Sequence, residues 1–402
     1  MLDQFGNHPS IICWVPFNEG WGQFDTERIT NLIKNTDPSR LVNSASGWAD
    51  RNVGDMHDIH AYPGPEIPEP EEKRAIVLGE FGGLGLPIEG YTWQSSDNWG
   101  YRNYKNREEL KAAYIDLIRR LQGMISKGLS AAVYTQTTDV EVEVNGLMTY
   151  DREIIKIEPK NMQRINKGYL PPVFYSTGEI FLNSTKVELS NELQKGKIYY
   201  TLDGSEPTQE DRLYEKPIKL NSTKTVRART YWSDGKFSSG TQKTFSKVEP
   251  LQSIKAEVVS GVEYYYYEKG IDDFSKLPDF EDLSPKSKGI TNQFNLSKAE
   301  KDYYFAMQFK GLIEVPRRGI YTFYSNSDDG TKLFIHDQLV VDNDFTHSMT
   351  EKTGQIALKK GKHPIELLFF QGEGGKGLEV SFAGPGLEKN VIPAENLFHK
   401  RN

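Results

Sequence analysis

The first 165 residues alternate short apolar runs with longer polar or amphipathic stretches. Two of those stretches, 25–37 and 106–128, space their apolar residues at helical intervals, and the second ends at Gly128. The apolar runs, each short enough for a single strand, are residues 11–17, 41–46, 58–62, 75–81 and 130–136. Strands that alternate with helices form parallel sheets, so the pattern predicts a parallel α/β region.

Beyond about residue 170 the pattern changes to short alternating segments. Tyr, Thr, Val and Phe alternate with polar residues between turns rich in Gly, Asn, Asp and Pro, and no long helical pattern appears. This texture is typical of all-β domains. Residues 166–172 and 246–253 have the composition of linkers. We therefore expect an α/β domain over 1–165, followed by β domains over 173–247 and 254–400.

Length and charge narrow the functional classes. A chain of 402 residues has room for about three domains. It carries 49 Lys and Arg against 56 Asp and Glu, a formal net charge of −7, which disfavours a dedicated binder of nucleic acids or anionic membranes. No apolar segment approaches the roughly 18 residues of a membrane span, and the first residues lack the pattern of a secretory signal. The single Cys13 excludes an internal disulfide.

Two glutamates end strand-like runs and are the chief candidates for catalysis. Glu19 follows the run 11–17, and Glu80 lies near the end of the run 75–81. Parallel α/β folds place their chemistry at the carboxyl ends of strands, and glycoside hydrolysis needs two carboxyl groups that converge on one cleft. Asp139 and Glu141 follow the last run and are weaker candidates for the same cleft. The alternative for each of the four is a solvated acid at a strand end.

The segments WVPFNEGWG (14–22) and VLGEFGG (77–83) give these glutamates a context. Together they resemble the catalytic half of a glycoside hydrolase family 2 (β/α)8 barrel. The resemblance implies that Asn18 and Glu19 end the fourth barrel strand and that Glu80 ends the seventh. Glu19 would then be the general acid/base, Glu80 the nucleophile, and Asn18 a hydrogen-bond partner of the neighbouring sugar hydroxyl. A retaining mechanism requires the two carboxyl groups to lie about 5–5.5 Å apart.

Further residues of the expected cleft follow from the same comparison. The family tends to carry a strand-six tyrosine near the nucleophile, and Tyr62 in HAYPGP matches it. His60 can share the inward face with Tyr62, whereas His57 points to the opposite face, so the two histidines are not expected to chelate one metal. Trp21 and Trp48 follow strands and are candidates for stacking on a sugar ring. For the histidines and tryptophans, ordinary packing is the alternative.

The resemblance also indicates an incomplete barrel. The chain begins just before the family's fourth barrel strand, and about 165 residues fall short of the roughly 250 of a complete barrel. We therefore expect strands four to eight of a (β/α)8 barrel, as the C-terminal part of a longer enzyme. Such a chain would associate with the missing N-terminal portion or with further copies of itself.

The β region resembles two accessory domains. YYTLDGSEPT (199–208) is similar to the small sandwich at the C-terminus of chitobiase-type enzymes. Residues 319–344 and 361–382 resemble the protective-antigen-type sandwich attached to many glycosidases and adhesins. In lectin members of that type an Asp-Asp pair binds Ca²⁺, and Asp328 and Asp329 lie at the matching place. Ca²⁺ prefers about six to eight oxygens, which residues 342–344 (Asp-Asn-Asp) are candidates to complete; the alternative is that both segments are polar turns.

Two hypotheses follow. The first is a retaining β-glycosidase, similar to β-galactosidases, β-glucuronidases or β-mannosidases, that acts by double displacement without a required cofactor. The second is a non-catalytic carbohydrate-binding or adhesion protein with an inert barrel remnant. Either role involves glycans and favours a periplasmic or extracellular location.

Overall fold

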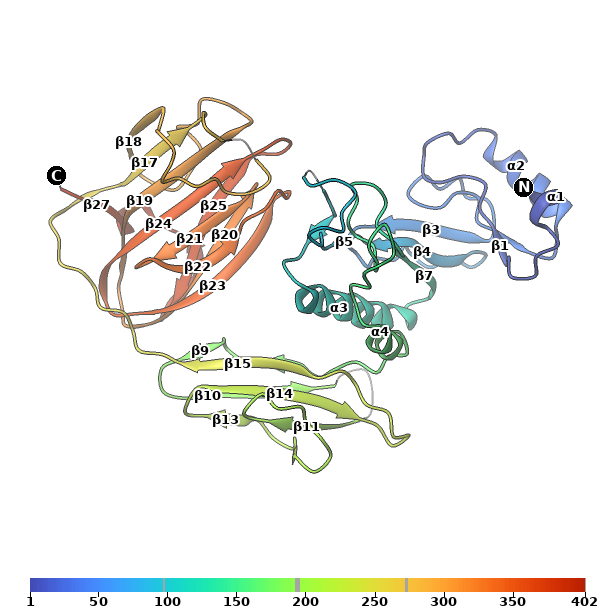
Figure 1. The fold of residues 1–402 in the computed structure, drawn as a ribbon, viewed down its shortest axis with the longest axis horizontal. Helices are drawn as coiled ribbons and strands as arrows, with labels where there is room; N and C mark the ends of the chain where they lie inside the picture. The colour runs from blue at the N-terminus through green and yellow to red at the C-terminus, as the bar shows by residue number, and fades with distance from the viewer. Residues whose placement is uncertain (97, 192–195, 272–273, 402) are drawn as a thin grey trace. The chain divides into compact units, whose positions relative to one another are not determined.

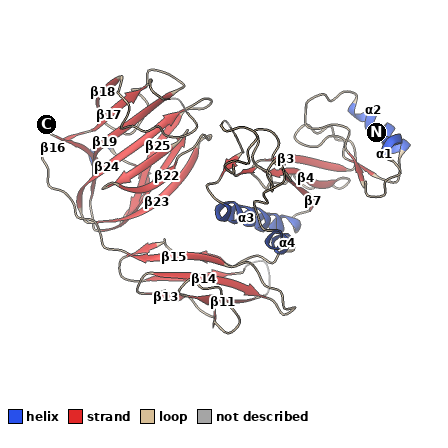
Figure 2. Cartoon of the chain, viewed as in Figure 1, coloured by secondary structure: helices blue, strands red, loops and turns tan. Residues whose placement is uncertain are grey.

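The computed structural model describes residues 1–96, 98–191, 196–271 and 274–401. Strands predominate over helices (Figure 2). The chain forms two compact units. The first unit comprises Met1–Pro172, Asn191–Ile198 and Arg229–Gly240, and the second comprises Val173–Ser190, Tyr199–Ala228 and Thr241–Asn402.

The strands within residues 1–172 are mostly parallel. They are β1 (Cys13–Trp14), β2 (Leu41–Val42), β3 (Met56–Ala61), β4 (Ala75–Gly82), β5 (Leu84–Gly85), β6 (Arg102–Asn103) and β7 (Leu129–Thr135). Parallel ladders join β1 to β2, β5 to β6, and β3, β4 and β7 in that order. Each expected apolar run thus contains a strand. Within the described residues no ladder joins β2 to β3, so a barrel arc over five strands stays a prediction.

Two details differ from the sequence-based expectation. The strand in run 11–17 stops before Pro16, because proline has no N–H for a ladder; beyond it Asn18 and Ser46 meet in a single parallel bridge. In addition, β2, β3 and β4 follow one another without an intervening helix among the described residues. The connection 62–74 contains four prolines, which oppose helix formation, so strict alternation of strand and helix is wrong here.

The helices of the first unit are α1 (Leu2–Phe5), α2 (Thr26–Thr36), α3 (Arg107–Ile125) and α4 (Pro159–Asn166). The longest, α3, begins at Asn106, whose side chain accepts a hydrogen bond from the N–H of Glu109. Leu110, Leu117 and Leu121 of α3 pack with Leu78 and Phe81 of β4 and form the unit's main core. No described helix has the length and hydropathy needed to cross a membrane.

The described residues of 173–247 form strands, turns and loops. In chain order the strands are β8 (Val173–Tyr175), β9 (Ile180–Phe181), β10 (Thr185–Ser190), β11 (Lys197–Thr201), β12 (Arg212–Leu213), β13 (Ile218–Leu220), β14 (Lys224–Tyr231) and β15 (Thr241–Lys247). They form one sheet of order β13-β10-β8 and another of order β12-β11-β14-β15-β9 (Figure 1). Buried residues alternate along β14, as the period of a half-buried strand requires.

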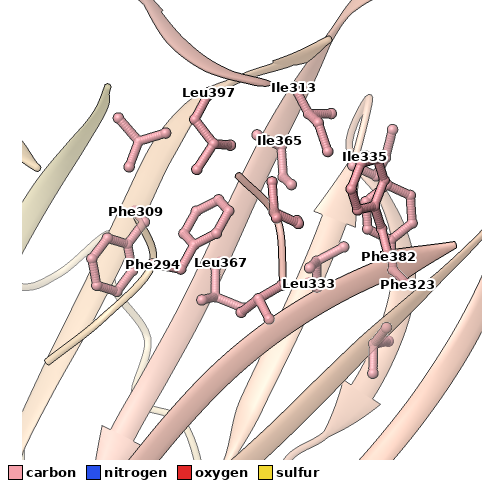
Figure 3. Close-up of a cluster of buried hydrophobic side chains, with 14 of the residues drawn as sticks. Phe294, Phe309, Ile313, Phe323, Leu333, Ile335, Ile365, Leu367, Phe382 and Leu397 are labelled. Atoms are coloured by element: carbon pink, nitrogen blue, oxygen red, sulfur yellow. The ribbon is translucent and has the colours of Figure 1, made fainter. Parts of the chain in front are cut away.

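Residues 258–400 form a larger pair of sheets (Figure 1). The eight-stranded sheet contains β16 (Val258–Ser260), β17 (Val262–Tyr267), β18 (Ser287–Thr291), β19 (Phe305–Val315), β21 (Thr331–Ile335), β22 (Gln338–Asn343), β24 (Gly361–Gln371) and β27 (Leu397–Lys400). The four-stranded sheet contains β20 (Gly319–Asp328), β23 (Thr350–Leu358), β25 (Gly377–Gly384) and β26 (Leu387–Val391), and the short helix η1 (Ala394–Asn396) precedes β27. Phe309, Phe323, Leu367 and Phe382 belong to the apolar core shown in Figure 3. The β region is therefore all-β and sandwich-like, as expected.

Candidate active site

Three of the expected site residues meet at the carboxyl ends of the parallel strands. Glu19 follows β1, His60 lies near the end of β3, and Glu80 lies near the end of β4. The Nδ1 atom of His60 is 3.0 Å from Oε1 of Glu19 and 3.4 Å from Oε2 of Glu80. One carboxylate oxygen of Glu19 and one of Glu80 lie within 4.8 Å of each other. Their side chains remain about a quarter exposed, at 26% and 29%, so a ligand can reach both.

The backbone of Glu19 is held in an uncommon conformation. Its φ of 56° lies in the left-handed region, which side chains other than glycine rarely adopt. The Glu19 N–H donates to the carbonyl of Ser46 over 2.5 Å, and the side chain of Gln23 donates to the Glu19 carbonyl over 2.6 Å. A Cβ at Gly47 would lie 3.0 Å from the His60 ring and 3.1 Å from Glu19 Cγ, so glycine leaves room for both side chains. Such strain is maintained where the surrounding contacts over-determine it.

Tyr62 orients the second glutamate. Its hydroxyl donates a hydrogen bond to Oε2 of Glu80, and its ring stacks on Tyr101 with centroids 3.9 Å apart and planes 4° apart. Burial, reinforced by the hydrogen bond to Glu80, raises the pKa of Tyr62 well above its ordinary value. The phenol therefore stays protonated and remains a donor to the carboxylate. Trp99 packs edge-on against Tyr101 at 5.3 Å and extends this aromatic group.

Beneath His60 lies a buried polar group that the sequence does not reveal. Ser46 Oγ is 2.8 Å from His60 Nε2 and 3.2 Å from Asp58 Oδ2. Asp58 also accepts hydrogen bonds from Asn43 Nδ2, at 2.5 Å, and from the N–H of Gly79, at 2.8 Å. Burial raises the pKa of Asp58, and these hydrogen bonds oppose the shift. Asp58 is only 3% exposed, so it is in contact with other residues of the protein rather than with solvent.

The two expected tryptophans lie beside Glu19. Trp21 and Trp48 pack edge to face with centroids 6.2 Å apart, and a Cβ at Gly20 would collide with the Trp48 ring. Their exposed fractions of 76% and 58% leave ring faces open to solvent. Exposed aromatic faces beside a pair of carboxylates are suited to contact the apolar faces of sugar rings.

Among the residues that the structure describes, two groups of donors are close enough to share a metal ion: Glu19, His60 and Glu80, and separately Asp50, His57 and Glu71. The two histidines belong to different groups, as their spacing on β3 predicts. In the second group Arg74 already supplies the positive charge, since its guanidinium nitrogens lie 2.7 Å from Asp50 and 2.5 Å from Glu71. The first group is the pair of candidate catalytic carboxylates with their histidine.

Asp139 was expected either to line the cleft or to be a solvated acid at a strand end, and both expectations are wrong. Asp139 neither lines the cleft nor faces solvent; its side chain is 2% exposed and lies 2.7 Å from the ammonium group of Lys156, which is fully buried. It also accepts a hydrogen bond from the N–H of Gly146. The carboxylate therefore fixes the chain that follows β7. No local pattern signals this pair, because Lys156 lies 17 positions away in an irregular segment.

The Asp328–Asp329 pair lies at the end of β20 and is buried, with 6% and 1% of each residue exposed. Asp329 accepts hydrogen bonds from the N–H groups of His347, at 3.0 Å, and Gly372, at 2.8 Å. Burial raises the pKa of both carboxyl groups, and the charge of Asp328 adds to the shift of Asp329. The expected helper Asp344 is engaged elsewhere, since it pairs with Lys332 at 2.6 Å.

Comparison with protein families matches three successive parts of the chain. Residues 1–78 match the TIM barrel domain of the glycosyl hydrolases family 2. Residues 176–242 match the chitobiase/beta-hexosaminidase C-terminal domain, and residues 259–396 match the PA14 domain. The first match includes Asn18, Glu19 and His60 and ends before Glu80.

Individual proteins and solved structures are similar to other lengths of the chain. A 99-residue part is 29% identical to the anti-sigma-I factor RsgI3 of Acetivibrio thermocellus; it amounts to 24% of this chain and 15% of that protein's length. Among solved structures, an anti-sigma factor domain-containing protein is 16% identical over 57% of this chain and 92% of its own, with a TM-score of 0.31. A PA14 sugar-binding domain from an RTX adhesin is 18% identical over 35% of this chain and 99% of its own, with a TM-score of 0.30. Three successive parts of the chain are thus similar to the family 2 glycosyl hydrolase barrel, the chitobiase-type C-terminal domain and the PA14 domain.

Proposed function

We propose that the first unit contains the acid/base and nucleophile of a retaining β-glycosidase. In this proposal β1, β2, β3, β4 and β7 correspond to barrel strands four to eight. The observation that carries it is the convergence of Glu19 and Glu80: one carboxylate oxygen of each lies within 4.8 Å of the other, a close approach that agrees better with the roughly 5–5.5 Å separation of retaining carboxyl groups than with a wider one. A water between two inverting carboxylates would require about 6.5–9.5 Å.

The mechanism assigns one role to each residue. Glu80 attacks the anomeric carbon and forms a glycosyl ester, while Glu19 gives its proton to the departing glycosidic oxygen. Glu19 then removes a proton from water, whose oxygen attacks the same carbon and releases Glu80. Tyr62 donates to Glu80 and directs the carboxylate toward the sugar. Asn18, by family resemblance, bonds the adjacent sugar hydroxyl, and the rings of Trp21 and Trp48 border the binding region.

The proposal is tested by covalent trapping at Glu80. We expect an activated 2-deoxy-2-fluoro-β-glycoside of the right sugar to lose its leaving group and form an ester with Glu80, because the fluorine slows hydrolysis of the intermediate. Intact mass and peptide mapping of the full chain, treated with gluco-, galacto-, manno- and glucurono-configured reagents, locate the adduct. A Glu80→Gln variant should not be labelled. An adduct at another residue, or none with any reagent on folded protein, contradicts the assignment.

The unpaired edges of the parallel strands indicate how the first unit associates with partners. In the described part of the chain β1 pairs with β2 alone and β7 with β4 alone. Ile12 and Val15 beside β1, and Val133 in β7, are more than 40% exposed. Free strand edges with exposed apolar residues favour association. The proposal therefore includes association with further barrel strands or with another copy of this chain, and an extracellular or periplasmic place of action on glycans.

A second candidate function is glycan binding through Ca²⁺ at the PA14 domain. The observation that favours it is the pair of adjacent buried carboxyl groups of Asp328 and Asp329, whose pKa values burial raises. A hard divalent cation would stabilise both in the ionised form. Oxygen ligands suit Ca²⁺, and Asp328, Asp329 and Asn343 would hold it, while the ion would coordinate sugar hydroxyls. If the barrel segment is inert, this domain makes the chain a carbohydrate-binding or adhesion protein.

Calorimetric titration of the full chain with Ca²⁺ tests this second function. We expect Asp328→Asn and Asp329→Asn each to weaken Ca²⁺ binding by at least about tenfold, because each removes a charged ligand. Asp302→Asn is the matched control, since that carboxylate is 79% exposed and pairs only with Lys376 among the contacts described. Equal affinities in all four proteins contradict the site. Glycan binding that persists in EDTA separates sugar recognition from the ion.

A further inference from the structure

Ser46 and Asp58 connect the interior of the first unit to the candidate acid/base. We propose that they are positioning residues that keep the Nε2 nitrogen of His60 protonated and thereby retain the catalytic proton on the Glu19–His60 pair. This inference rests on the proposed glycosidase function. It concerns residues that touch neither the substrate nor the reacting atoms.

The direction of the hydrogen bonds follows from Asp58. Its Oδ1 accepts the Gly79 N–H and its Oδ2 accepts from Asn43, so the carboxylate is arranged as an acceptor at both oxygens. A Cβ at Gly79 would lie 2.3 Å from the carboxylate, so glycine permits this close approach. The Ser46 hydroxyl has one hydrogen and is 3.2 Å from Oδ2, to which it donates. Its lone pair then faces His60 Nε2 at 2.8 Å, and that nitrogen must carry a hydrogen.

The consequence appears at the other ring nitrogen. With the hydrogen on Nε2, neutral His60 offers a lone pair at Nδ1 to Glu19 Oε1, 3.0 Å away. That contact is favourable only if a proton lies between the two groups, either on the Glu19 carboxyl or on the ring as imidazolium. In both placements one proton stays on Glu19 or His60, where it is available to the departing glycosidic oxygen of the substrate. If Ser46 donated to Nε2 instead, His60 would carry its hydrogen on Nδ1 and would stabilise an ionised Glu19, which has no proton to give.

The other groups that face the ring agree with this placement. Glu80 approaches the same nitrogen at 3.4 Å, and its Oε2 already accepts the Tyr62 hydroxyl. Tyr101 lies near both glutamates, and burial together with nearby carboxylate charges raises its pKa, so it stays neutral. His60 is 3% exposed in its side chain and has no described cationic neighbour in these contacts. The one mobile proton therefore belongs to Glu19 and His60.

Nitrogen NMR of the full chain labelled at its seven histidines tests the tautomer without any turnover. A His60→Gln variant assigns the signals. We expect a protonated Nε2 in the native protein and a shift of the population to Nδ1–H in Asp58→Asn. The asparagine keeps an oxygen for Gly79 but presents its NH₂ group to Ser46, which turns the Ser46 hydrogen toward His60. Ser46→Ala should give mixed tautomers, and Ser130→Ala, at an exposed site on β7, should match the native spectrum.

Leaving-group dependence supplies the second readout. We expect Asp58→Asn and Ser46→Ala to lower kcat/KM about tenfold to 10²-fold on phenyl-type glycosides and little on dinitrophenyl glycosides, which depart without a proton. An equal loss on both substrates would mean a merely structural role. Nδ1–H in the native protein, or unchanged tautomers in Asp58→Asn, overturns the inference. If the chain hydrolyses no substrate, the glycosidase proposal fails. The NMR result still tests whether Asp58 and Ser46 keep the Nε2 nitrogen of His60 protonated.

Discussion

Replacement of Glu80 by glutamine is expected to reduce hydrolysis of aryl β-glycosides by about 10⁴- to 10⁶-fold, the loss typical of a removed nucleophile. An amide is a far weaker nucleophile than a carboxylate and cannot form the glycosyl ester. The substitution keeps the size of the side chain and an oxygen for the Tyr62 hydroxyl. The loss should therefore appear in kcat/KM without a loss of folded protein. Initial rates over a panel of β-glycosides measure it and identify the sugar.

Glu89→Gln is the matched control for this experiment. Glu89 lies in the same unit, is exposed and is nine positions from Glu80. Its substitution should leave the rate unchanged. Turnover that survives in Glu80→Gln would remove Glu80 from the mechanism. A folded native chain without turnover on any sugar would favour the proposed glycan binding by residues 259–396 and leave the similarity of residues 1–78 to the family 2 barrel as a sign of ancestry.

The convergence of the site could be predicted because it depends on strand geometry. Glu19 and Glu80 are 61 positions apart, yet both lie at the carboxyl ends of strands in parallel ladders. The period of two along β3 also places His60 with them and sends His57 to the cluster around Arg74. The local hydrophobic pattern that predicts each strand therefore also predicts where these residues lie on it.

Other parts of the site depend on contacts that no local pattern encodes. Tyr101 reaches Tyr62 because the β5–β6 pair returns the chain to Gly83, where a Cβ would collide with the Tyr101 ring. Ser46 and Asp58 occur in ordinary strand-like runs, and only the structure shows that the Ser46 hydroxyl lies within hydrogen-bond distance of both Asp58 and His60. Pairs that are close in space through loops leave no periodic signal.

Secondary structure shows the same difference between local patterns and loop contacts. Strands and the strongly periodic helix α3 followed from apolar spacing, while the general alternation of strand and helix fails at β2, β3 and β4, which follow one another without an intervening helix in the described residues. Between β3 and β4, the four prolines of residues 62–74 oppose a helix. In the β region, turn chemistry and alternation were enough for the class of fold, because long strands such as β20 and β24 bury every second side chain.

The ion pair of Lys156 and Asp139 should be the most stability-sensitive polar contact described in the first unit. Lys156→Ala is expected to lower the unit's free energy of unfolding by about 3–5 kcal/mol, because it leaves an unpaired carboxylate in the interior. The lysine ammonium lies 2.7 Å from Asp139 Oδ1 and donates to the Val144 carbonyl at 2.8 Å. Burial raises the pKa of Asp139 and lowers that of Lys156, and their mutual attraction opposes both shifts.

Urea unfolding followed by tryptophan fluorescence isolates this effect, since all six tryptophans belong to the first unit. The double variant Lys156→Met with Asp139→Asn should recover much of the loss, because it removes both charges and keeps an oxygen for the Gly146 N–H. Arg28→Ala breaks an exposed pair with Asp25 and should leave the urea midpoint nearly unchanged. If Lys156→Ala behaves like Arg28→Ala, water reaches Asp139 and the pair is not a structural constraint. A large loss with recovery in the double variant would instead mean that charge neutrality, rather than the lysine itself, holds the segment after β7 against the core.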